Sequence, residues 1–322
     1  MESSVAIGID VGATNLKAAV VDALGRVLAQ LVRETAGLGP EQGIRQIARL
    51  VGELQSQLSL ERSEIIGIGI GAPGPLSYRT GRIIRSANMP GWVDVPLRDR
   101  LREELGLAVT LDNDGNAAAF GEYWAGAGRD GGDLVMLTLG TGVGAGVVLD
   151  GRVLHGHFEN AAELGHIIVA ADGLPCPCGQ RGCLEQYASA SGVARRVVAA
   201  IKTGEPCNLA DMVMGGQAID AECVVESARA GDPLCLRVFD EACLYLGIAC
   251  VNIQHTFNPA RIVLGGGMSQ VGALLVDRVA EYARRHTWSL HSDLPAIALA
   301  ELGYDAGVIG AAGLAWQDYT GR

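Results

Sequence analysis

The chain repeats one pattern of apolar and glycine residues near its start and again in its middle. Residues 5–28 read VAIGIDVGATNLKAAVVDALGRVL, and residues 134–154 read LVMLTLGTGVGAGVVLDGRVL. Each segment has two apolar runs around a glycine-rich turn and ends in Arg-Val-Leu, so each is predicted to form a β-hairpin. The aligned positions are Asp10 and Thr138, Gly12 and Gly140, and Asp22 and Asp150. Two matching hairpins predict a duplicated α/β fold whose cleft is faced by both turns; chance similarity between two common hairpins is the alternative.

The rest of the chain continues the alternation of strands and helices. Helix-like stretches at about 41–60 and 189–202 come after the two hairpins, and RIVLGGGMS (261–269) predicts a third glycine turn between a strand and a helix. We expect a first domain over residues 1–115 and a second over 116–300. An apolar helix within about 301–322 is expected to pack back on the first domain.

Charge and composition narrow the class of partner. The 322 residues are 49% hydrophobic and carry a formal net charge of -11, which argues against a nucleic-acid partner and favours a small molecule. The opening residues MESSVAIGID resemble no signal peptide, and no apolar run approaches the ~18 residues of a membrane span. We therefore expect a cytoplasmic protein without a membrane partner, whose eight cysteines stay reduced.

The glycine turns suit phosphate binding. Converging backbone N–H groups can approach a phosphate closely where no Cβ intervenes. The first turn offers Gly12, Thr14 and Asn15, and Asp10 stands at the strand end where it could hold a hydrated Mg²⁺. Neither turn has the Gly-Lys-Ser/Thr ending of a P-loop, and either alone could be an ordinary tight turn. The residues of the second turn are Gly140, Thr141, Gly142 and Gly144.

A run of carboxylates and amides ends another predicted strand. In VTLDNDGNAAAFGEY (109–123) the apolar strand ends at Asp112-Asn113-Asp114, and a helix comes next. Ligands bind at the carboxyl ends of strands in open α/β sheets. The alternative, that Asp114 or Asn116 only caps the helix, explains one residue and not the whole run.

Three cysteines crowd the segment CPCGQRGC (176–183). Cys176, Cys178 and Cys183, with His166 ten residues upstream, make the Cys₃His set of a closed structural zinc site. Buried or reactive thiols beside an unrelated histidine are the alternative. The metal loop would hold Glu163 and Glu185 rigidly near one another, which suits a site that hydrogen-bonds a polyol.

These motifs together resemble one family of sugar kinases. DVGATNLK, LGTGVGAG, ELGH, CPCGQRGCLEQYAS, NMPGW (88–92), DNDGNAAA and DAGVIGAA (305–312) are similar to the ROK family (repressor, open reading frame, kinase) over essentially the whole chain. The resemblance implies an ATP-dependent hexokinase in which two domains of ribonuclease-H-like, actin-like ATPase topology surround a cleft. It also implies ATP, Mg²⁺ and structural Zn²⁺ as cofactors, and a homodimer by family analogy.

The resemblance also implies roles for individual residues. Asp114 would be the general base that takes the proton of the sugar's 6-hydroxyl. His166 would bind zinc through one ring nitrogen and the sugar through the other. The other implied sugar-binding residues are Gly74, Asn88, Asn113, Glu163 and Glu185. The implied nucleotide-binding residues are Asp10, Gly12, Thr14, Asn15, Lys17, Gly140, Thr141 and Gly142, with Gly265, Gly266 and Gly267 near the adenosine.

One departure affects the expected sugar. Bacterial glucokinases of this group usually have Gly-Glu-x-Gly-His, whereas this chain has Ala162 before Glu163. That variant also resembles the kinase domain that acts on N-acetylmannosamine. Glucose is the first expectation, and N-acetylmannosamine or N-acetylglucosamine is the alternative.

Three other functions fit the sequence less well. A transcriptional repressor would need a helix-turn-helix, for which the segment before the first predicted strand leaves no room. A sugar sensor without catalysis conflicts with the presence of Asp114, Asp10 and both glycine turns. Polyphosphate as phosphoryl donor would call for more basic residues near the cleft than a net charge of -11 suggests.

Overall fold

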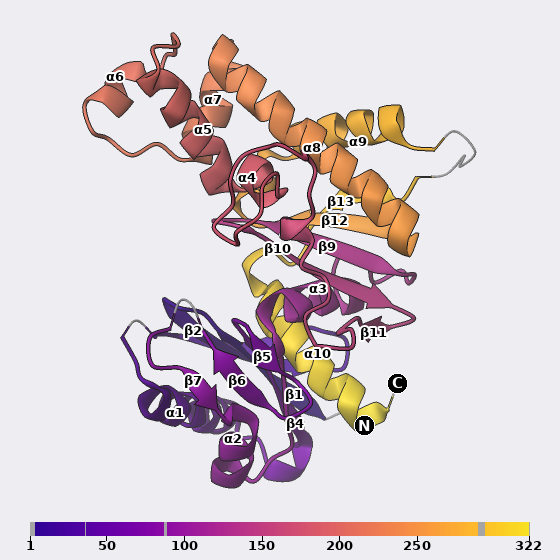
Figure 1. The fold of residues 1–322 in the computed structure, drawn as a ribbon. Helices are drawn as coiled ribbons and strands as arrows, with labels where there is room; N and C mark the ends of the chain where they lie inside the picture. Colours follow the sequence, from indigo (N-terminus) through magenta and orange to yellow (C-terminus); the bar gives the residue numbers. More distant parts are fainter. Residues whose placement is uncertain (1–3, 36, 87–88, 289–293, 322) are drawn as a thin grey trace. The chain divides into compact units, whose positions relative to one another are not determined.

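Two five-stranded sheets with the same strand order form the framework of the protein. The computed structural model describes residues 4–35, 37–86, 89–288 and 294–321. One sheet has the order β3-β2-β1-β4-β8 and the other β11-β10-β9-β12-β13 (Figure 1). The strands of the first are β1 (Val5–Val11), β2 (Asn15–Asp22), β3 (Val27–Glu34), β4 (Ile65–Ala72) and β8 (Val109–Asn113). Those of the second are β9 (Leu134–Leu139), β10 (Val143–Leu149), β11 (Arg152–Val153), β12 (Arg261–Gly265) and β13 (Ala296–Leu299).

Both predicted hairpins are confirmed, and the equal strand order confirms the duplicated α/β fold. Strand β1 pairs antiparallel with β2 and parallel with β4, and β4 pairs parallel with β8. In the second sheet β9 and β10 are neighbours joined by three residues, which only an antiparallel pair allows. Each repeat therefore places a hairpin at one side of its sheet and parallel strands at the other.

The chain divides into two compact units. One contains the residues up to Leu134, Gly146–Ala162 and the residues from Glu301 onward, and the other contains Val135–Ala145 and Glu163–Ala300. We call them unit 1 and unit 2. The domain limits expected from the sequence, 1–115 and 116–300, stay a prediction.

Unit 1 adds helices and a small sheet to the first five-stranded sheet. The amphipathic helix α1 buries Ile44, Ile47, Val51 and Leu54 at helical spacing, as a core-facing helix should. A three-stranded sheet, β5-β6-β7, lies in the same unit. The helices are α1 (Pro40–Leu58), α2 (Leu97–Leu105), α3 (Asp114–Trp124) and α10 (Ala306–Thr320), with the short turns η1 (Arg62–Glu64) and η4 (Gly303–Asp305). The small strands are β5 (Leu76–Ser77), β6 (Arg82–Arg85) and β7 (Val93–Val95).

The last helix packs on the first sheet, as the sequence predicts. Helix α10, yellow in Figure 1, contacts α3, β1 and β4. A Cβ on Gly8 would lie 1.9 Å from the Val308 carbonyl oxygen, and one on Gly69 would lie 1.7 Å from that of Ala311. The glycines of β1 and β4 therefore let the backbone of α10 approach the sheet closely.

Unit 2 is richer in helices. The predicted helix at 189–202 is confirmed as α5, and the predicted strand at 261 leads through the short turn η3 into α9. The helices are α4 (Glu185–Ala188), α5 (Ala190–Lys202), α6 (Ala210–Met214), α7 (Ala221–Arg229), α8 (Pro233–Phe257) and α9 (Ala273–His286), with the turns η2 (Leu164–His166) and η3 (Gly267–Val271).

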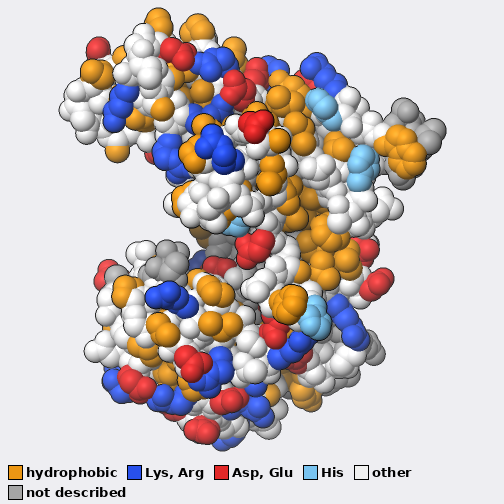
Figure 2. All heavy atoms as spheres, viewed as in Figure 1, with side chains coloured by type: hydrophobic (Ala, Val, Ile, Leu, Met, Phe, Trp, Pro, Cys, Tyr) orange, Lys and Arg blue, Asp and Glu red, His pale blue; other side chains and the backbone are white. Residues whose placement is uncertain are grey.

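Charges of both signs are mixed on the surface that Figure 2 shows. On the face that Figure 2 shows, Lys and Arg side chains are interspersed with Asp and Glu side chains instead of forming one basic patch. Among the described residues, none of the helices combines the length and hydropathy that a transmembrane segment requires.

Candidate functional site

One group of candidate site residues lies at one edge of the sheet of unit 1. The parallel strands β1, β4 and β8 place Asp10 opposite Gly71, and Gly71 opposite Asp112. Adjacent strands lie about 4.8 Å apart, so the strand ends bring these carboxylates to one edge. Asp10 and Asp112 therefore lie near the same edge of the sheet.

Asp10 lies in a buried environment that disfavours its charge. Burial and the neighbouring charge of Asp114 raise the pKa of Asp10 to about 6, while Lys17 acts in the opposite direction. A Cβ on Gly307, in the first turn of α10, would lie 2.9 Å from Asp10 Oδ2. The carboxylate thus packs against a glycine at the start of a helix. A bound cation would favour its charged form and so offset the effect of burial.

Lys17 is already engaged within unit 1. Its Nζ lies 3.1 Å from Asp305 Oδ1 and also donates to the carbonyl oxygen of Tyr304. These contacts hold β2 to the segment before α10. The phosphate contact implied for Lys17 stays a prediction.

Asn113 is the N-cap of α3. Its Oδ1 accepts the N–H of Gly115 at 2.9 Å and of Asn116 at 3.4 Å, so the alternative of Asp114 or Asn116 as the cap was wrong. Because Oδ1 is used for capping, Nδ2 is the end of the amide left to donate elsewhere. A Cβ on Gly74 would lie 3.4 Å from this Nδ2. The two predicted sugar ligands Gly74 and Asn113 are therefore neighbours.

Asp114 begins α3 close to β4. Its Cα lies 3.6 Å from the position that a Cβ on Gly71 would take, so the glycine allows the close approach. The N–H of Gly115 donates to Asp114 Oδ1 at 2.8 Å. The charge of Asp114 acts on Asp10, so the two carboxylates lie near one another. Asn88, the other sugar ligand predicted nearby, lies outside the described residues.

The first glycine turn joins β1 to β2. The N–H of Gly12 donates to the carbonyl oxygen of Asn15 at 2.9 Å, and the hydroxyl of Thr35 donates to the carbonyl oxygen of Gly12 at 2.7 Å. Thr14 and Asn15 are exposed. The base of the turn is therefore fixed by hydrogen bonds, and its tip is open to solvent.

The second glycine turn, in unit 2, stands at the start of a helix. The Gly140 N–H donates to the carbonyl oxygen of Gly142 at 3.0 Å, and the carbonyl oxygen of Gly140 accepts the first N–H of α5, from Ala190, at 2.8 Å. The hydroxyl of Ser191 donates to the carbonyl oxygen of Thr141. A turn beside a helix N-terminus is a favourable place for an anion.

The predicted metal ligands come together in unit 2. The ligand atoms of His166, Cys176, Cys178 and Cys183 all lie within 4.8 Å of one another. Cys178 Sγ is 3.6 Å from Cys183 Sγ, and Cys176 Sγ is 3.8 Å from His166 Nδ1. Zinc bonds of about 2.3 Å to sulfur and 2.0 Å to nitrogen give a tetrahedron with edges of roughly 3.6–3.8 Å, so this donor set fits the ion.

Of the two acids beside the cysteine cluster, Glu185 contacts the residue that follows the second glycine turn. Glu185 Oε2 accepts the N–H of Val143 at 3.3 Å, and Glu185 Oε1 lies 3.8 Å from Cys176 Sγ. A Cβ on Gly165 would lie 2.0 Å from the carbonyl oxygen of Val143. Glu163 is exposed immediately before η2. The cysteine cluster, the second turn and Glu185 thus form one packed assembly.

The third glycine turn comes after β12. Gly266 has a φ of 80°, and a Cβ there would lie 2.7 Å from the Leu139 nitrogen. A Cβ on Gly265 would meet Met136, whereas Gly267 has open space around it. Glycine is therefore required at Gly266, where the obstacle is backbone, whereas at Gly265 the obstacle is the flexible end of the Met136 side chain.

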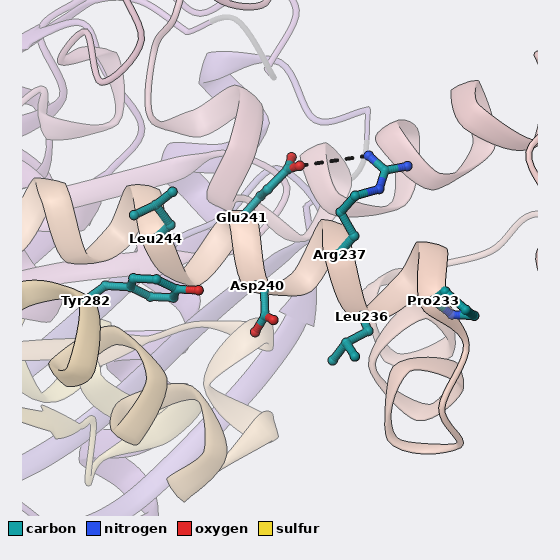
Figure 3. Close-up of a pocket in the computed structure, with 7 residues that line it drawn as sticks. All are labelled: Pro233, Leu236, Arg237, Asp240, Glu241, Leu244 and Tyr282. Atoms are coloured by element: carbon teal, nitrogen blue, oxygen red, sulfur yellow. Dashed lines mark ion pairs between the residues drawn. The ribbon is translucent and has the colours of Figure 1, made fainter.

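Two hollows lined by residues of unit 2 could hold a ligand. One of about 880 Å³ is lined by Thr141, one face of α5, and residues of α6, α7 and the connection between them. The other, of about 400 Å³, lies along α8 and is shown in Figure 3. Its charged groups include Arg237 and Glu241, which pair at 3.8 Å, and its lining contains none of the predicted site residues. The first hollow is therefore the better candidate for a nucleotide, since Thr141 belongs to the second turn.

Three sets of polar contacts were not predicted from the sequence. Glu122 is fully buried in α3, and Asp112 contacts His155 at 2.6 Å. In unit 2, Cys207 and Cys235 are 3.6 Å apart beside Asp232, the N-cap of α8. All three depend on contacts between residues distant in sequence. The only local signal was at the start of α8, where Asp232 is followed three residues later by Cys235.

Comparison with known proteins identifies the family. The ROK family pattern matches residues 6–318. A glucokinase of Halalkalibacterium halodurans is 38% identical to this chain, and the aligned region covers 97% of this chain and 94% of the glucokinase. A ROK family glucokinase from Streptomyces griseus, in complex with glucose and AMPPNP, is 34% identical, with a TM-score of 0.78 over 98% of this chain and 100% of its own. A ROK hexokinase from Thermus thermophilus is 33% identical, with a TM-score of 0.86 over 99% and 100% of the two chains. The chain belongs to the ROK family.

Proposed function

We propose that the protein transfers the γ-phosphoryl group of ATP to the 6-hydroxyl of a hexose, and that the hexose is glucose. The observation that carries the proposal is the edge of the first sheet, where Asp114, Asn113 and Gly74 lie together and Asp10 is near. Relatives named as glucokinases, 32–38% identical over most of the chain, support it. So does the solved relative that holds glucose and AMPPNP.

The residues of unit 1 would perform the proton transfer. Asp114 would accept the proton of the attacking hydroxyl, a role that requires a carboxylate within hydrogen-bond reach of that hydroxyl. The Nδ2 group of Asn113 would donate to a sugar hydroxyl and so orient the acceptor. Most of the rate enhancement in phosphoryl transfer comes from such alignment and from neutralisation of charge.

The glycine turns would hold the phosphates. The first turn and Asp10 would lie on the side of the transferred group, and Gly140 to Gly142 would hold the phosphates at the start of α5. The hollow beside Thr141 would take the nucleoside. Mg²⁺, when bound with ATP, supplies positive charge, and Asp10 is the residue that would help to hold it.

Unit 2 contains the other residues that would bind the sugar, around the cysteine cluster. His166 Nδ1 faces Cys176, so Nε2 remains for a sugar hydroxyl. Glu163 and Glu185 would accept hydrogen bonds from other hydroxyls. Zinc, when bound to His166 and the three cysteines, would crosslink this segment and contribute to folding. We further propose a cytoplasmic homodimer, by analogy with the family.

A coupled ADP-release assay tests the function. Glucose, mannose, fructose, N-acetylglucosamine and N-acetylmannosamine are compared at matched concentrations with ATP and Mg²⁺. Glucose should give the highest kcat/KM. If N-acetylmannosamine or N-acetylglucosamine dominates instead, the protein is an amino-sugar kinase and Ala162 is a candidate for the residue that marks its specificity. No turnover with any sugar would contradict the kinase proposal.

The variant Asp114→Asn tests the proposed base. The amide keeps the shape of the side chain but accepts a proton poorly, so kcat should fall by at least about 10²-fold. The sugar affinity, measured by calorimetry, should stay within a few-fold of the wild type. Near-normal turnover would exclude Asp114 as the base.

A further inference from the structure

A buried carboxylate lies directly before the proposed catalytic turn. The Asp112 side chain is 5% exposed. Its Oδ1 accepts the N–H of Asn113 at 2.7 Å and the Nδ2 of Asn116 at 2.8 Å. Its Oδ2 lies 2.6 Å from His155 Nε2. Three groups from two distant parts of unit 1 therefore surround one carboxylate.

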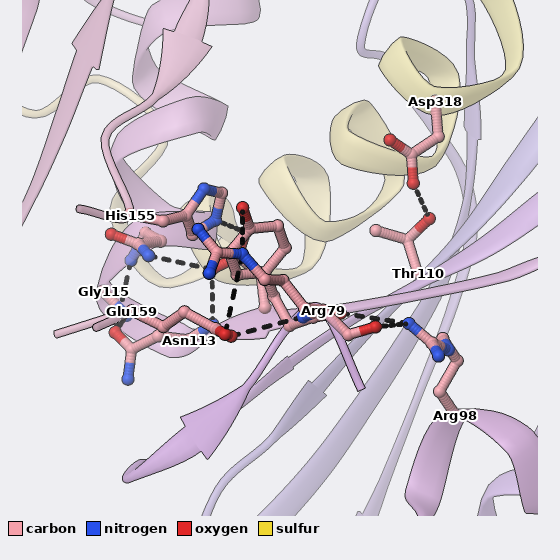
Figure 4. Close-up of polar contacts among 11 residues, drawn as sticks. Arg79, Arg98, Thr110, Asn113, Gly115, His155, Glu159 and Asp318 are labelled. Atoms are coloured by element: carbon pink, nitrogen blue, oxygen red, sulfur yellow. Dashed lines mark hydrogen bonds and ion pairs between the residues drawn. The ribbon is translucent and has the colours of Figure 1, made fainter. Parts of the chain in front are cut away.

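The imidazole of His155 is held from both sides. Its ring stacks on Tyr78 with centroids 3.7 Å apart and 18° between the planes. Arg98 donates to the carbonyl oxygens of Tyr78 and Arg79 at 3.0 and 3.1 Å, which fixes the turn that carries the tyrosine. Figure 4 shows His155 among these polar contacts. The ring thus has one well-defined position against Asp112.

The turn that carries Tyr78 is also tied to the segment that carries His155. The Arg79 backbone N–H donates to Glu159 Oε2 at 3.3 Å, and Arg79 Nη1 donates to the carbonyl oxygen of His157 at 3.3 Å. The segment leads on to Glu163, a proposed sugar ligand. His155 therefore lies where the strand end at Asp112, the turn after Gly74 and the segment that leads to Glu163 meet within unit 1.

We propose that His155 is a positioning residue that fixes the turn Asn113–Asp114 through the carboxylate of Asp112. The inference rests on the proposed kinase function. A buried carboxylate that loses one of three donors is left with an unsatisfied lone pair and rotates toward other donors, which weakens its bond to the Asn113 N–H. A displacement of a catalytic group by about 1 Å can lower the rate of the reaction by as much as 10²-fold.

Two nearly isosteric variants separate this role from simple packing. His155→Gln keeps a side-chain N–H donor at the reach of Nε2, whereas His155→Met fills similar space without a donor. Both lose the aromatic stack on Tyr78, so both should lower the thermal midpoint by similar amounts. His155→Met should lower kcat by about 10-fold or more with a smaller change in KM for ATP, and His155→Gln should retain kcat within about 3-fold of the wild type.

Tyr78→Phe is the matched control. It preserves the ring that stacks on His155, so its kcat should equal that of the wild type. Equal losses of kcat in His155→Gln and His155→Met, or an unchanged kcat in His155→Met, would overturn the positioning role. The kinase proposal would stand in either case, because it depends on the activity of the wild-type protein. A wild-type protein that phosphorylates no hexose would overturn both.

Discussion

Two aspartates of the first hairpin have opposite electrostatic environments. Burial and the charge of Asp114 raise the pKa of Asp10 to about 6. At Asp22 burial also acts to raise the pKa, but hydrogen bonds from Arg26 and Leu24 overcome it and lower the pKa below 3.8. The charged form of Asp10, at the proposed cation site, therefore lowers the free energy of unfolding, whereas the charged form of Asp22, at the hairpin end, raises it.

This difference predicts opposite effects of two amide variants. The folded protein binds the Asp10 proton more tightly than the unfolded chain, so this residue lowers stability as the pH rises from about 4 to about 6. Asp10→Asn should raise the free energy of unfolding at pH 7.5 by about 1–3 kcal/mol, with no gain near pH 4, and should abolish turnover.

Asp22→Asn is the control with the opposite sign. Its lowered pKa gives stability above pH 4 that is lost as the pH falls, so this variant should be less stable at pH 7.5 and nearly unchanged near pH 3. Urea unfolding of both variants without Mg²⁺ measures these effects. An Asp10→Asn protein that is less stable than the wild type at pH 7.5 would contradict the assigned environment of Asp10.

Ala162 has a backbone conformation that favours glycine. Its φ is 67°, in the left-handed region where a Cβ costs roughly 1–2 kcal/mol. Glycine removes this strain, but it also increases the conformational entropy of the unfolded chain, which lowers the free energy of unfolding by about 0.5–1 kcal/mol. Ala162→Gly should therefore leave the free energy of unfolding unchanged or raise it by up to about 1 kcal/mol. Ala161→Gly, at a residue without a positive φ, should lower it by about 0.5–1 kcal/mol. A loss of equal size in both variants, by urea unfolding, would show that position 162 carries no strain.

At the level of elements, local periodicity in the sequence predicted the regular structure. The hairpins, α5, β12 and α10 arise from apolar runs, glycine turns and helical spacing, and the repeat indicated that the two sheets are related. The cap at Asn113 was missed because Asp and Asn are both good caps and three candidates stand in one run. The pair of Asp112 and His155 could not be predicted, because its partners are 43 residues apart and meet only in the folded unit.

Glu122 shows how one side chain ties elements together. It is fully buried, and its oxygens accept N–H groups from Ala127 at 2.8 Å, Leu302 at 2.8 Å and Glu301 at 3.1 Å. The carboxylate thus joins the end of α3 to the segment that leads into α10. A Cβ on Gly126 would lie 2.2 Å from Glu122 Oε2, so the turn after α3 requires glycine there.

Glu122→Gln should destabilise unit 1. The amide places an N–H group opposite backbone N–H donors, so at least one buried donor loses its acceptor, at about 1–3 kcal/mol. Glu53→Gln is the control, because Glu53 is 49% exposed in its pair with Arg33 and such pairs contribute about 0–1 kcal/mol. Urea unfolding should separate the two variants clearly. Equal midpoints would show that Glu122 does not connect α3 to α10.

At the level of the whole molecule, the chain passes between the two units several times. Unit 1 is assembled from three separate segments and unit 2 from two. Each unit nevertheless has its own set of residues with a proposed role. The proposed base, Asp10 and the first turn belong to unit 1, and the second turn and the cysteine cluster belong to unit 2. Each unit thus contains proposed binding groups of its own.

Because the cysteine cluster belongs to unit 2, loss of zinc is predicted to lower the thermal stability of unit 2 first. Three tryptophans, at positions 92, 124 and 316, belong to unit 1, and Trp288 belongs to unit 2. Cys178 is exposed, so Cys178→Ser removes a ligand without leaving a cavity. The variant should bind less zinc and unfold its unit 2 helices at a lower temperature, because a closed metal site contributes folding free energy.

Two spectroscopic signals distinguish the units. In Cys178→Ser the helical transition seen by far-ultraviolet circular dichroism should shift downward more than the transition seen by tryptophan fluorescence, because most of the tryptophans lie in unit 1. Cys223→Ser, at a half-buried cysteine of α7 outside the cluster, should change neither the zinc content nor the order of the two transitions. Equal shifts of both signals would mean that the units unfold together, and a wild-type protein without zinc would exclude the metal site itself.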